Sequence, residues 1–359
     1  MTGQIPIEKN LNSRKNSINW DNLKFGTYFS DHCFVSTYQN KSWDTGKIIP
    51  YQPLNFEPAM CTLHYGQSIF EGLKAYRTKT GEVQLFRPEM NAKRLNHSAS
   101  MLCIPAYDEQ HLLTAIKTLV NLDRDFIPQH EGQSLYIRPF VFGSGQFLGV
   151  SVSHEYQLIV MTSPVASYYA EGVKPINILV CTDHARAVSG GLGSAKTSAN
   201  YAASLYATQK AHQEGFAQVL WLDAMNRQDI DEVGSMNIFF VIDGVLITPS
   251  LDKGTILAGI TRDSVLTLAR EFGMVIEERT ISINEVVAAH KAGLLSEVFG
   301  TGTAAVISPV GMLQYEGQPL IINDKQIGPV AKRFYDTLTG IQSGELTDKH
   351  GWVMKVETA

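Results

Sequence analysis

The chain has 359 residues, of which 44% are hydrophobic and 18% are charged. This length allows two domains of ordinary size, and the low charged fraction excludes a largely disordered chain. A formal net charge of −5 argues against a nucleic-acid partner and a polybasic membrane anchor, and no stretch approaches the roughly 20 apolar residues of a membrane span.

The first half of the chain predicts a mixture of strands and helices. A polar lead-in over residues 1–30 is followed by an early strand. Apolar residues three to four apart predict a helix over 90–102, and Pro88 suits its start. The alternating segment 135–140 and the short apolar run 158–161 both indicate strands.

A change in composition after Met161 indicates a link between two domains. Residues 163–175 carry two prolines, a glycine and small side chains. We therefore expect a smaller domain at 1–168, a linker at 169–176, and a larger domain at 177–359.

The second half begins with a predicted strand at 176–181 and a glycine-rich loop at 189–195. A helix over 198–213 and a strand over 217–222 follow. Asp243-Gly244 lies between two apolar runs, 238–242 and 245–247, which is a strong signal for a two-residue hairpin turn.

Two further helices are expected near the C-terminal end. The first covers 261–272, with Thr261 as its cap and Gly273 at its end, and the second covers 284–292. A strand at 297–299 leads into a Gly/Thr loop at 300–305. Helices and strands mixed in both halves predict two α/β or α+β domains.

The cysteines and the N-terminus suggest a location for the protein. Four cysteines without a C-x-x-C pair do not form a disulfide framework, and no histidine or cysteine spacing indicates a zinc site. The first residues are polar and lack an apolar secretion core. We expect a cytoplasmic protein without a metal.

The loop at 189–201 is the first candidate for chemistry. Three glycines within four residues precede Lys196, which lies in a mostly uncharged stretch. A lone lysine in a loop is usually solvated. The spacing also matches neither a Walker loop, which needs adjacent Gly-Lys-Ser/Thr, nor a dinucleotide fingerprint.

Four other segments carry polar groups that suit a ligand site. Glu232 comes just before an apolar strand, where it could face a cationic ring nitrogen, although loop acids are common there. The segment 259–261 approaches a helix start, which is a natural phosphate site. The loop 299–305 offers hydroxyl and N–H groups. Tyr136 and Arg138 are two apart in a strand and so face the same side.

Taken together and in order, seven segments resemble those of the branched-chain amino-acid aminotransferases, which are fold type IV enzymes dependent on pyridoxal 5′-phosphate. The resemblance runs from about residue 20 to 340. The segments are LHYGQSIFEGLKAY (63–76), LFRPEMNAKRLNHSA (85–99), LYIRPFVFG (135–143), GGLGSAKTSANY (190–201), EVGSMNIFFV (232–241), GTILAGITRDSVL (254–266) and EVFGTGTAAVISP (297–309).

The resemblance implies a two-domain fold with a small N-terminal α/β domain and a larger, barrel-like C-terminal α/β domain. It implies that Lys196 carries pyridoxal phosphate through a Schiff base and later shuttles a proton. Glu232 matches the acid partner of the pyridine nitrogen. Among the remaining cofactor-binding positions, those that match phosphate-binding residues are Arg94, Ile260, Thr261 and Thr303. Tyr201 and Ser235 match residues that contact the cofactor ring.

The resemblance also implies how amino acids and 2-oxo acids bind. Tyr65, Phe70 and Tyr136 match the aromatic residues that line the family's substrate pocket. Arg138 matches the arginine that binds the distal carboxylate of glutamate. Thr303 and Ala304 match further substrate contacts. Leu148 and Val150 match residues that the family contributes to the neighbouring subunit, which implies a homodimer.

One departure from the pattern concerns thiol chemistry. The animal enzymes of the longer subgroup, which this chain resembles, carry a redox C-x-x-C after the Gly/Thr loop, whereas these positions read Ala305 and Ser308 here. This favours a bacterial-type member without thiol regulation.

Three alternatives compete with this interpretation. A D-amino-acid aminotransferase or an aminodeoxychorismate lyase would share the lysine, the acid and the phosphate-binding residues. The residues that line its substrate pocket differ. A catalytically silent paralogue is disfavoured because Lys196, Glu232 and Arg94 are all present. A nucleotide-binding enzyme lacks its expected motifs.

Overall fold

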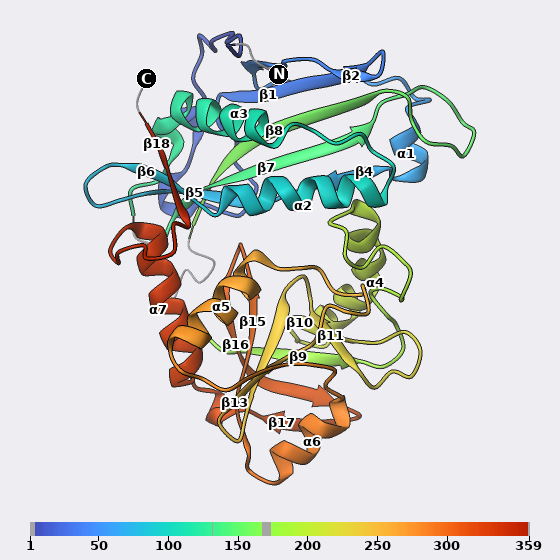
Figure 1. Cartoon of the computed structure of the whole chain (residues 1–359), viewed down its shortest axis with the longest axis vertical. Helices are drawn as coiled ribbons and strands as arrows, with labels where there is room; N and C mark the ends of the chain where they lie inside the picture. Colours follow the sequence, from blue (N-terminus) through green and yellow to red (C-terminus); the bar gives the residue numbers. More distant parts are fainter. Residues whose placement is uncertain (1–3, 131, 167–173, 358–359) are drawn as a thin grey trace. The chain divides into compact units, whose positions relative to one another are not determined.

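The computed structural model describes residues 4–130, 132–166 and 174–357 (Figure 1). The chain forms two compact units. The first contains Met1–Tyr168, Ala195–Ala199 and Gly340–Ala359, and the second contains Tyr169–Ser194 and Asn200–Thr339. Most of the predicted linker at 169–176 lies outside the described residues. The contiguous domain boundaries stay a prediction, and the short segment around Lys196 groups with the first unit.

The first unit is built on one antiparallel sheet. Its strands follow the order β18-β6-β5-β7-β8-β1-β2, with β3 paired to β1 and β4 paired to β7. These strands are β1 (His32–Gln39), β2 (Ser42–Trp43), β3 (Lys47–Pro50), β4 (Ser68–Phe70), β5 (Leu73–Arg77), β6 (Val83–Phe86), β7 (Ser134–Gly143), β8 (Tyr156–Val165) and β18 (Val353–Val356).

Two helices cover one face of this sheet, α2 (Pro88–Met101) and α3 (Glu109–Leu122), as Figure 1 shows. Their apolar residues share one core with the strands; Leu95 of α2 and Leu119 of α3 pack there with Leu135 of β7. Asp108 caps α3 by accepting from the N–H of His111. A short helix, α1 (Cys61–Tyr65), precedes β4.

The second unit is built on a mixed sheet in the order β11-β10-β9-β16-β15-β12-β13-β14, with β17 paired to β16. Strand β9 runs parallel to both β10 and β16, and β13 runs parallel to β14. The strands are β9 (Ile176–Cys181), β10 (Gln218–Leu222), β11 (Ile230–Val233), β12 (Asn237–Ile242), β13 (Val245–Thr248), β14 (Ile276–Glu278), β15 (Leu295–Gly302), β16 (Val306–Tyr315) and β17 (Gln318–Ile321).

The remaining helices are α4 (Ser198–Gln213), α5 (Ile260–Glu271), α6 (Ile283–Lys291) and α7 (Pro329–Ser343). Buried Ala207 and Ala211 of α4 pack with Trp221 of β10. Helix α6 packs through Val286, and Ser282 caps it. Glu297 accepts from the N–H groups of residues 330 and 331 at the start of α7. Short 3₁₀ helices cover Lys15–Ser17, Trp20–Asn22, Arg124–Phe126 and Asn323–Lys325.

The mixed α/β class expected from the sequence is confirmed. The helix at 198–213 and the hairpin around Asp243-Gly244 are also confirmed. Two local expectations are wrong. Thr261 is the second residue of α5 rather than its cap, because the cap position belongs to Gly259. Residues 163–165 are strand rather than linker, since β8 continues through them beside β7.

Among the described helices, none combines the length and the apolar composition that a bilayer span requires.

Candidate active site

The backbone of Lys196 is fixed by two elements of the first unit. Its carbonyl accepts from the N–H of Phe70 at 3.0 Å, and the hydroxyl of Thr197 donates to the carbonyl of Ser68 at 2.8 Å. The N–H of Lys196 donates to the hydroxyl of Ser98 on α2 at 2.9 Å. Residues 195–199 therefore extend the edge of β4 although they lie some 130 positions away in the chain.

The amine of Lys196 lies against Phe70, with Nζ 4.8 Å from the ring centroid. The residue as a whole is only partly exposed. Burial first, and then the guanidinium groups of Arg94 and Arg138, lower the pKa of Lys196 to about 8, with Glu71 and Tyr136 acting in the opposite direction. With this pKa, about a tenth of the amine is neutral at pH 7, far more than for an ordinary lysine, and the neutral form is a nucleophile and a base.

Arg94 is paired with a buried carboxylate. Its Nε lies 2.7 Å from Oε1 of Glu71, and its Nη2 donates to Oε2 at 2.9 Å. Asn91 donates to the same Oε2 at 2.7 Å. Burial would raise the pKa of Glu71, but Arg94, Lys196 and Asn91 outweigh it and hold that pKa below its ordinary value. Glu71 is therefore a charged partner of Arg94.

An aromatic and cationic surface lies next to Lys196. The Nη2 of Arg138 donates to the Tyr136 hydroxyl at 3.0 Å, and its guanidinium carbon lies 4.7 Å from the Phe70 centroid. Tyr136 and Arg138 thus face the same side of β7, as predicted. Gly72 is required there, because a side chain at that position would overlap the Tyr136 hydroxyl. The Nε of Arg138 is buried and has no acceptor among the described residues.

The other predicted substrate residues of this unit lie on and beyond α1. The hydroxyl of Tyr65 donates to the carbonyl of Leu148. Tyr65 is exposed, and the apolar side chains of Leu148 and Val150 are 66% and 85% exposed. The structure thus joins Tyr65 to the segment that contains Leu148 and Val150.

A buried carboxylate forms the centre of the second unit's candidate residues. Oε1 of Glu232 accepts from the N–H of Leu257 at 3.1 Å and from Asn237 at 3.3 Å. Oε2 lies 2.7 Å from Nε of Arg186, although the N–H does not point along the line between these atoms. Two donors and one neighbouring cation, all from separate segments, therefore hold Glu232 in one orientation.

Two further candidate segments lie next to this carboxylate. Asn237 also donates to the carbonyl of Leu257, and its Oδ1 lies so close to Gly259 that a side chain at position 259 would displace it. Gly259 precedes α5, so the helix start at Ile260 and Thr261 has no side-chain cap from that position. A helix start of this kind suits an anion.

The Gly/Thr loop lies at the end of a neighbouring strand. Asn237 pairs with Thr301, and Val233 and Met236, on either side of the turn that contains Ser235, lie against Gly300 of β15. Thr303 and Ala304 form the turn between β15 and β16. Tyr201 is partly buried and lies in the first turn of α4. The strands of this unit therefore bring Glu232, Ser235 and the 303–304 turn to one region.

Sequence reasoning missed four residues that position the others: Glu71, Ser98, Arg186 and Asn237. Each is polar and mostly buried in the structure. Glu71 lies within the segment 63–76, but a single acid just after a strand carries no signal of its partner. Arg186 could have been noticed as the one cation between β9 and the glycine-rich loop.

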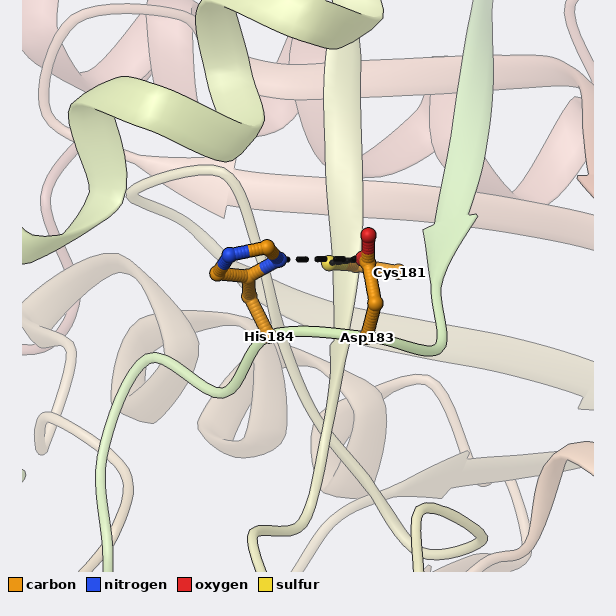
Figure 2. Close-up of side chains that lie close together, drawn as sticks. All are labelled: Cys181, Asp183 and His184. Atoms are coloured by element: carbon orange, nitrogen blue, oxygen red, sulfur yellow. Dashed lines mark hydrogen bonds and ion pairs between the residues drawn. The ribbon is translucent and has the colours of Figure 1, made fainter.

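One group of three potential metal ligands is present among the described residues: Cys181, Asp183 and His184 (Figure 2). Asp183 Oδ1 accepts from the Cys181 thiol at 3.4 Å and lies 3.1 Å from Nδ1 of His184. The other oxygen lies 3.2 Å from the ammonium of Lys210. The carboxylate is already satisfied by these partners, and an ammonium beside it opposes a cation. We assign no metal to this group.

Comparison with known proteins identifies the family. Residues 68–312 match the family model described as Amino-transferase class IV. The branched-chain-amino-acid aminotransferase 2 of Bacillus subtilis (strain 168) is 52% identical over 357 residues, which cover 99% of this chain and 98% of that protein. The chain belongs to the branched-chain aminotransferases. A Mycolicibacterium smegmatis branched-chain-amino-acid aminotransferase is 42% identical over 93% of this chain and 92% of its own length.

Solved structures of this family share the fold. The Escherichia coli branched-chain amino acid aminotransferase matches with a TM-score of 0.74 and 28% identity, covering 91% of this chain and 99% of that one. The T.th. branched-chain amino acid aminotransferase, solved with pyridoxamine 5′-phosphate, matches with a TM-score of 0.75 and 28% identity over 90% of this chain and 98% of its own. The fold type IV architecture is therefore shown.

The pKa of Lys196 gives a testable prediction. An amine with a pKa of about 8 instead of 10.5 has a neutral fraction about 100-fold larger at pH 8. Acylation of Lys196 by an amine-selective reagent, followed by peptide mapping, should therefore rise through about pH 8. Lys210, whose pKa is raised by its hydrogen bond to Asp183, is the control and should react only at higher pH. Equal pH profiles for the two lysines would contradict this assignment.

Proposed function

We propose that this protein is a branched-chain-amino-acid transaminase that uses pyridoxal 5′-phosphate. It transfers the amino group of L-leucine, L-isoleucine or L-valine to 2-oxoglutarate, giving branched-chain 2-oxo acids and L-glutamate. The observation that carries this proposal is the 52% identity over 357 residues with a branched-chain-amino-acid aminotransferase. The chemistry of the site residues in both units supports it.

The donor set fits the parts of this cofactor. A phosphate suits a guanidinium and a helix start, which Arg94 in the first unit and residues 260–261 in the second provide, with Thr303 as a further donor. The pyridine nitrogen suits the buried carboxylate of Glu232. Tyr201 and Ser235 are proposed as ring contacts, and Lys196 as the covalent attachment. When bound, the cofactor supplies an electron sink for negative charge at the substrate α-carbon.

Lys196 moves the proton in this proposal. Its neutral amine would remove the proton from the substrate α-carbon and deliver it to the C4′ carbon of the cofactor, acting first as a base and then as an acid. The lowered pKa of Lys196 suits both roles near neutral pH. The bonds from Phe70 and Ser98 to its backbone limit where this amine can reach.

Glu232 acts through its charge. Asn237, the N–H of Leu257 and Arg186 keep its carboxylate oriented, so that it would hold the pyridine nitrogen of the bound cofactor without having to reorganise. A preoriented charge placed where charge develops is an effective form of catalysis.

Substrate selection is proposed to rest on an apolar wall next to one cation. Phe70, Tyr65 and Tyr136 provide aromatic surface for branched side chains. Arg138, whose buried Nε has no acceptor among the described residues, binds the distal carboxylate of glutamate. The turn residues Thr303 and Ala304 contact the substrate carboxylate.

We also propose a homodimer that works in the cytoplasm. Leu148 and Val150 expose apolar side chains beside the carbonyl that holds Tyr65, which suits contribution to a neighbouring subunit's site. The cysteines Cys33, Cys61, Cys103 and Cys181 are all free thiols, as is usual in a reducing compartment.

Replacing Lys196 tests the attachment. Lys196→Ala removes the amine that binds the cofactor and moves the proton, so the yellow colour should be lost and transamination should fall by at least about 100-fold. Absorbance spectroscopy and a coupled assay measure both effects. Lys210→Ala, which removes an exposed amine on α4, is the matched control and should retain colour and activity. A yellow, active Lys196→Ala protein would refute the assignment.

Substrate choice separates this function from its closest alternative. Purified protein should transfer the amino group of L-leucine to 2-oxoglutarate and leave D-alanine unreacted, because the aromatic wall matches the branched-chain enzymes. Glutamate formation is the measurement. Activity on D-alanine alone would instead indicate a D-amino-acid aminotransferase.

The dimer can be tested by analytical ultracentrifugation. The wild-type protein should sediment as a dimer of 39.7 kDa chains. Val150→Asp places a charge on a side chain that is 85% exposed, so it should leave the fold intact and weaken only the association. A wild-type monomer with full activity would contradict the proposal that neighbouring subunits share the site.

A further inference from the structure

Helix α2 carries a line of buried polar residues. Asn91, Arg94 and Ser98 are three and four positions apart, which places them on one face of the helix. Asn91 and Ser98 are buried, and the Arg94 side chain is 10% exposed. Buried polar groups on a helix need partners, and these partners are Glu71 and the backbone of Lys196.

Glu71 uses both of its oxygens within this group. Oε1 accepts from Nε of Arg94, while Oε2 accepts from Nη2 of Arg94, from Asn91 and from the N–H of Gly72 at 3.1 Å. Its side chain is 1% exposed. A carboxylate this deeply buried is kept only where several donors compensate for its lost hydration.

The pairing fixes the plane of the Arg94 guanidinium. Two parallel bonds to one carboxylate allow only one orientation of the planar group. Arginine has five N–H donors in a rigid fork, and Glu71 takes one from Nε and one from Nη2. The edge of the guanidinium that carries Nη1 is thereby directed away from Glu71.

Resting on the proposed function, we propose that Glu71 is a positioning residue. It holds the Arg94 guanidinium in the orientation that receives the cofactor phosphate, and its negative charge balances the two guanidinium groups that face the Lys196 amine.

The second role follows from the charges around Lys196. Arg94 on α2 and Arg138 on β7 favour the neutral amine, whereas Glu71 after β4 and Tyr136 on β7 favour the protonated one. Glu71 stays ionised because Arg94 and Lys196 keep its pKa low despite its burial. Without this charge the pKa of Lys196 would fall below about 8, and the amine would be a weaker base.

Three variants separate charge from geometry. Glu71→Gln removes the charge and one of the paired bonds, and Glu71→Asp keeps the charge but shortens the reach to Arg94. Glu297→Gln is the matched control, since it also neutralises a buried carboxylate, whose bonds go to the start of α7. Circular dichroism first establishes that each variant is folded.

The first readout uses protein without cofactor. Lysines are reductively methylated with ¹³C, and the Lys196 resonance, assigned with Lys196→Ala, is titrated by NMR. Glu71→Gln should lower its pKa by about one unit, which is about a tenfold change in the protonation equilibrium. Glu71→Asp and Glu297→Gln should stay close to wild type. An unchanged pKa in Glu71→Gln would overturn the charge role.

The second readout is the affinity for pyridoxal 5′-phosphate, measured by fluorescence titration. Both Glu71→Gln and Glu71→Asp should weaken binding by about tenfold, because a charge-assisted pair to Arg94 is lost or displaced. Affinities equal to that of Glu297→Gln would overturn the positioning role. If wild-type protein binds no cofactor at all, the proposed function fails, while the NMR titration still decides the charge role independently.

Discussion

The chemistry of this site depends on one constraint: an amine must be buried beside two guanidinium groups and still remain able to gain and lose a proton. Lys196 meets this constraint because burial and the neighbouring cations favour its neutral form, while Glu71 and Tyr136 oppose them. A lysine at the surface, with a pKa near its ordinary value, would have a far smaller neutral fraction at neutral pH. The environment of the amine therefore determines its chemistry more than its position in a glycine-rich loop does.

This environment is assembled from segments that are distant in the chain. Residues 195–199 pair with β4, the N–H of Lys196 bonds to Ser98 of α2, and Arg138 comes from β7. Strand β4 itself pairs with β7, so the aromatic surface and the lysine share one framework. In the second unit, Glu232 is oriented in the same way by bonds from Asn237 and Leu257. In both cases the functional group is held by hydrogen bonds from elements other than its own.

Much of the fold could be predicted because its signals are local. The spacing of apolar residues indicates α2 and α4, and Asp243-Gly244 indicates the β12–β13 hairpin. Helices α3 and α7 are not among the predicted elements, although α3 has a clear apolar face. A threonine before a helical pattern usually caps the helix, which is why Thr261 is predicted as a cap, whereas Gly259 takes that position and allows close approach of Asn237.

The candidate site could be predicted in its outline but not in its supporting contacts. The resemblance to the family indicated Lys196, Arg94 and Glu232, and the two-residue spacing indicated that Tyr136 and Arg138 face one side. Asn91, Arg94 and Ser98 are polar residues on a helix, which from sequence alone indicate a solvated face. Only the tertiary structure reveals that this line is buried, because Glu71 and the Lys196 backbone come from elsewhere in the chain.

The most direct test is to identify which lysine carries the cofactor. Lys74 is a second buried amine, paired across the sheet with Tyr136, and burial also lowers its pKa to about 8. Protein loaded with pyridoxal 5′-phosphate would be reduced with borohydride, digested and mapped by mass spectrometry. The cofactor mass should appear on the peptide that contains Lys196. An adduct on Lys74, or on no lysine at all, would contradict this expectation.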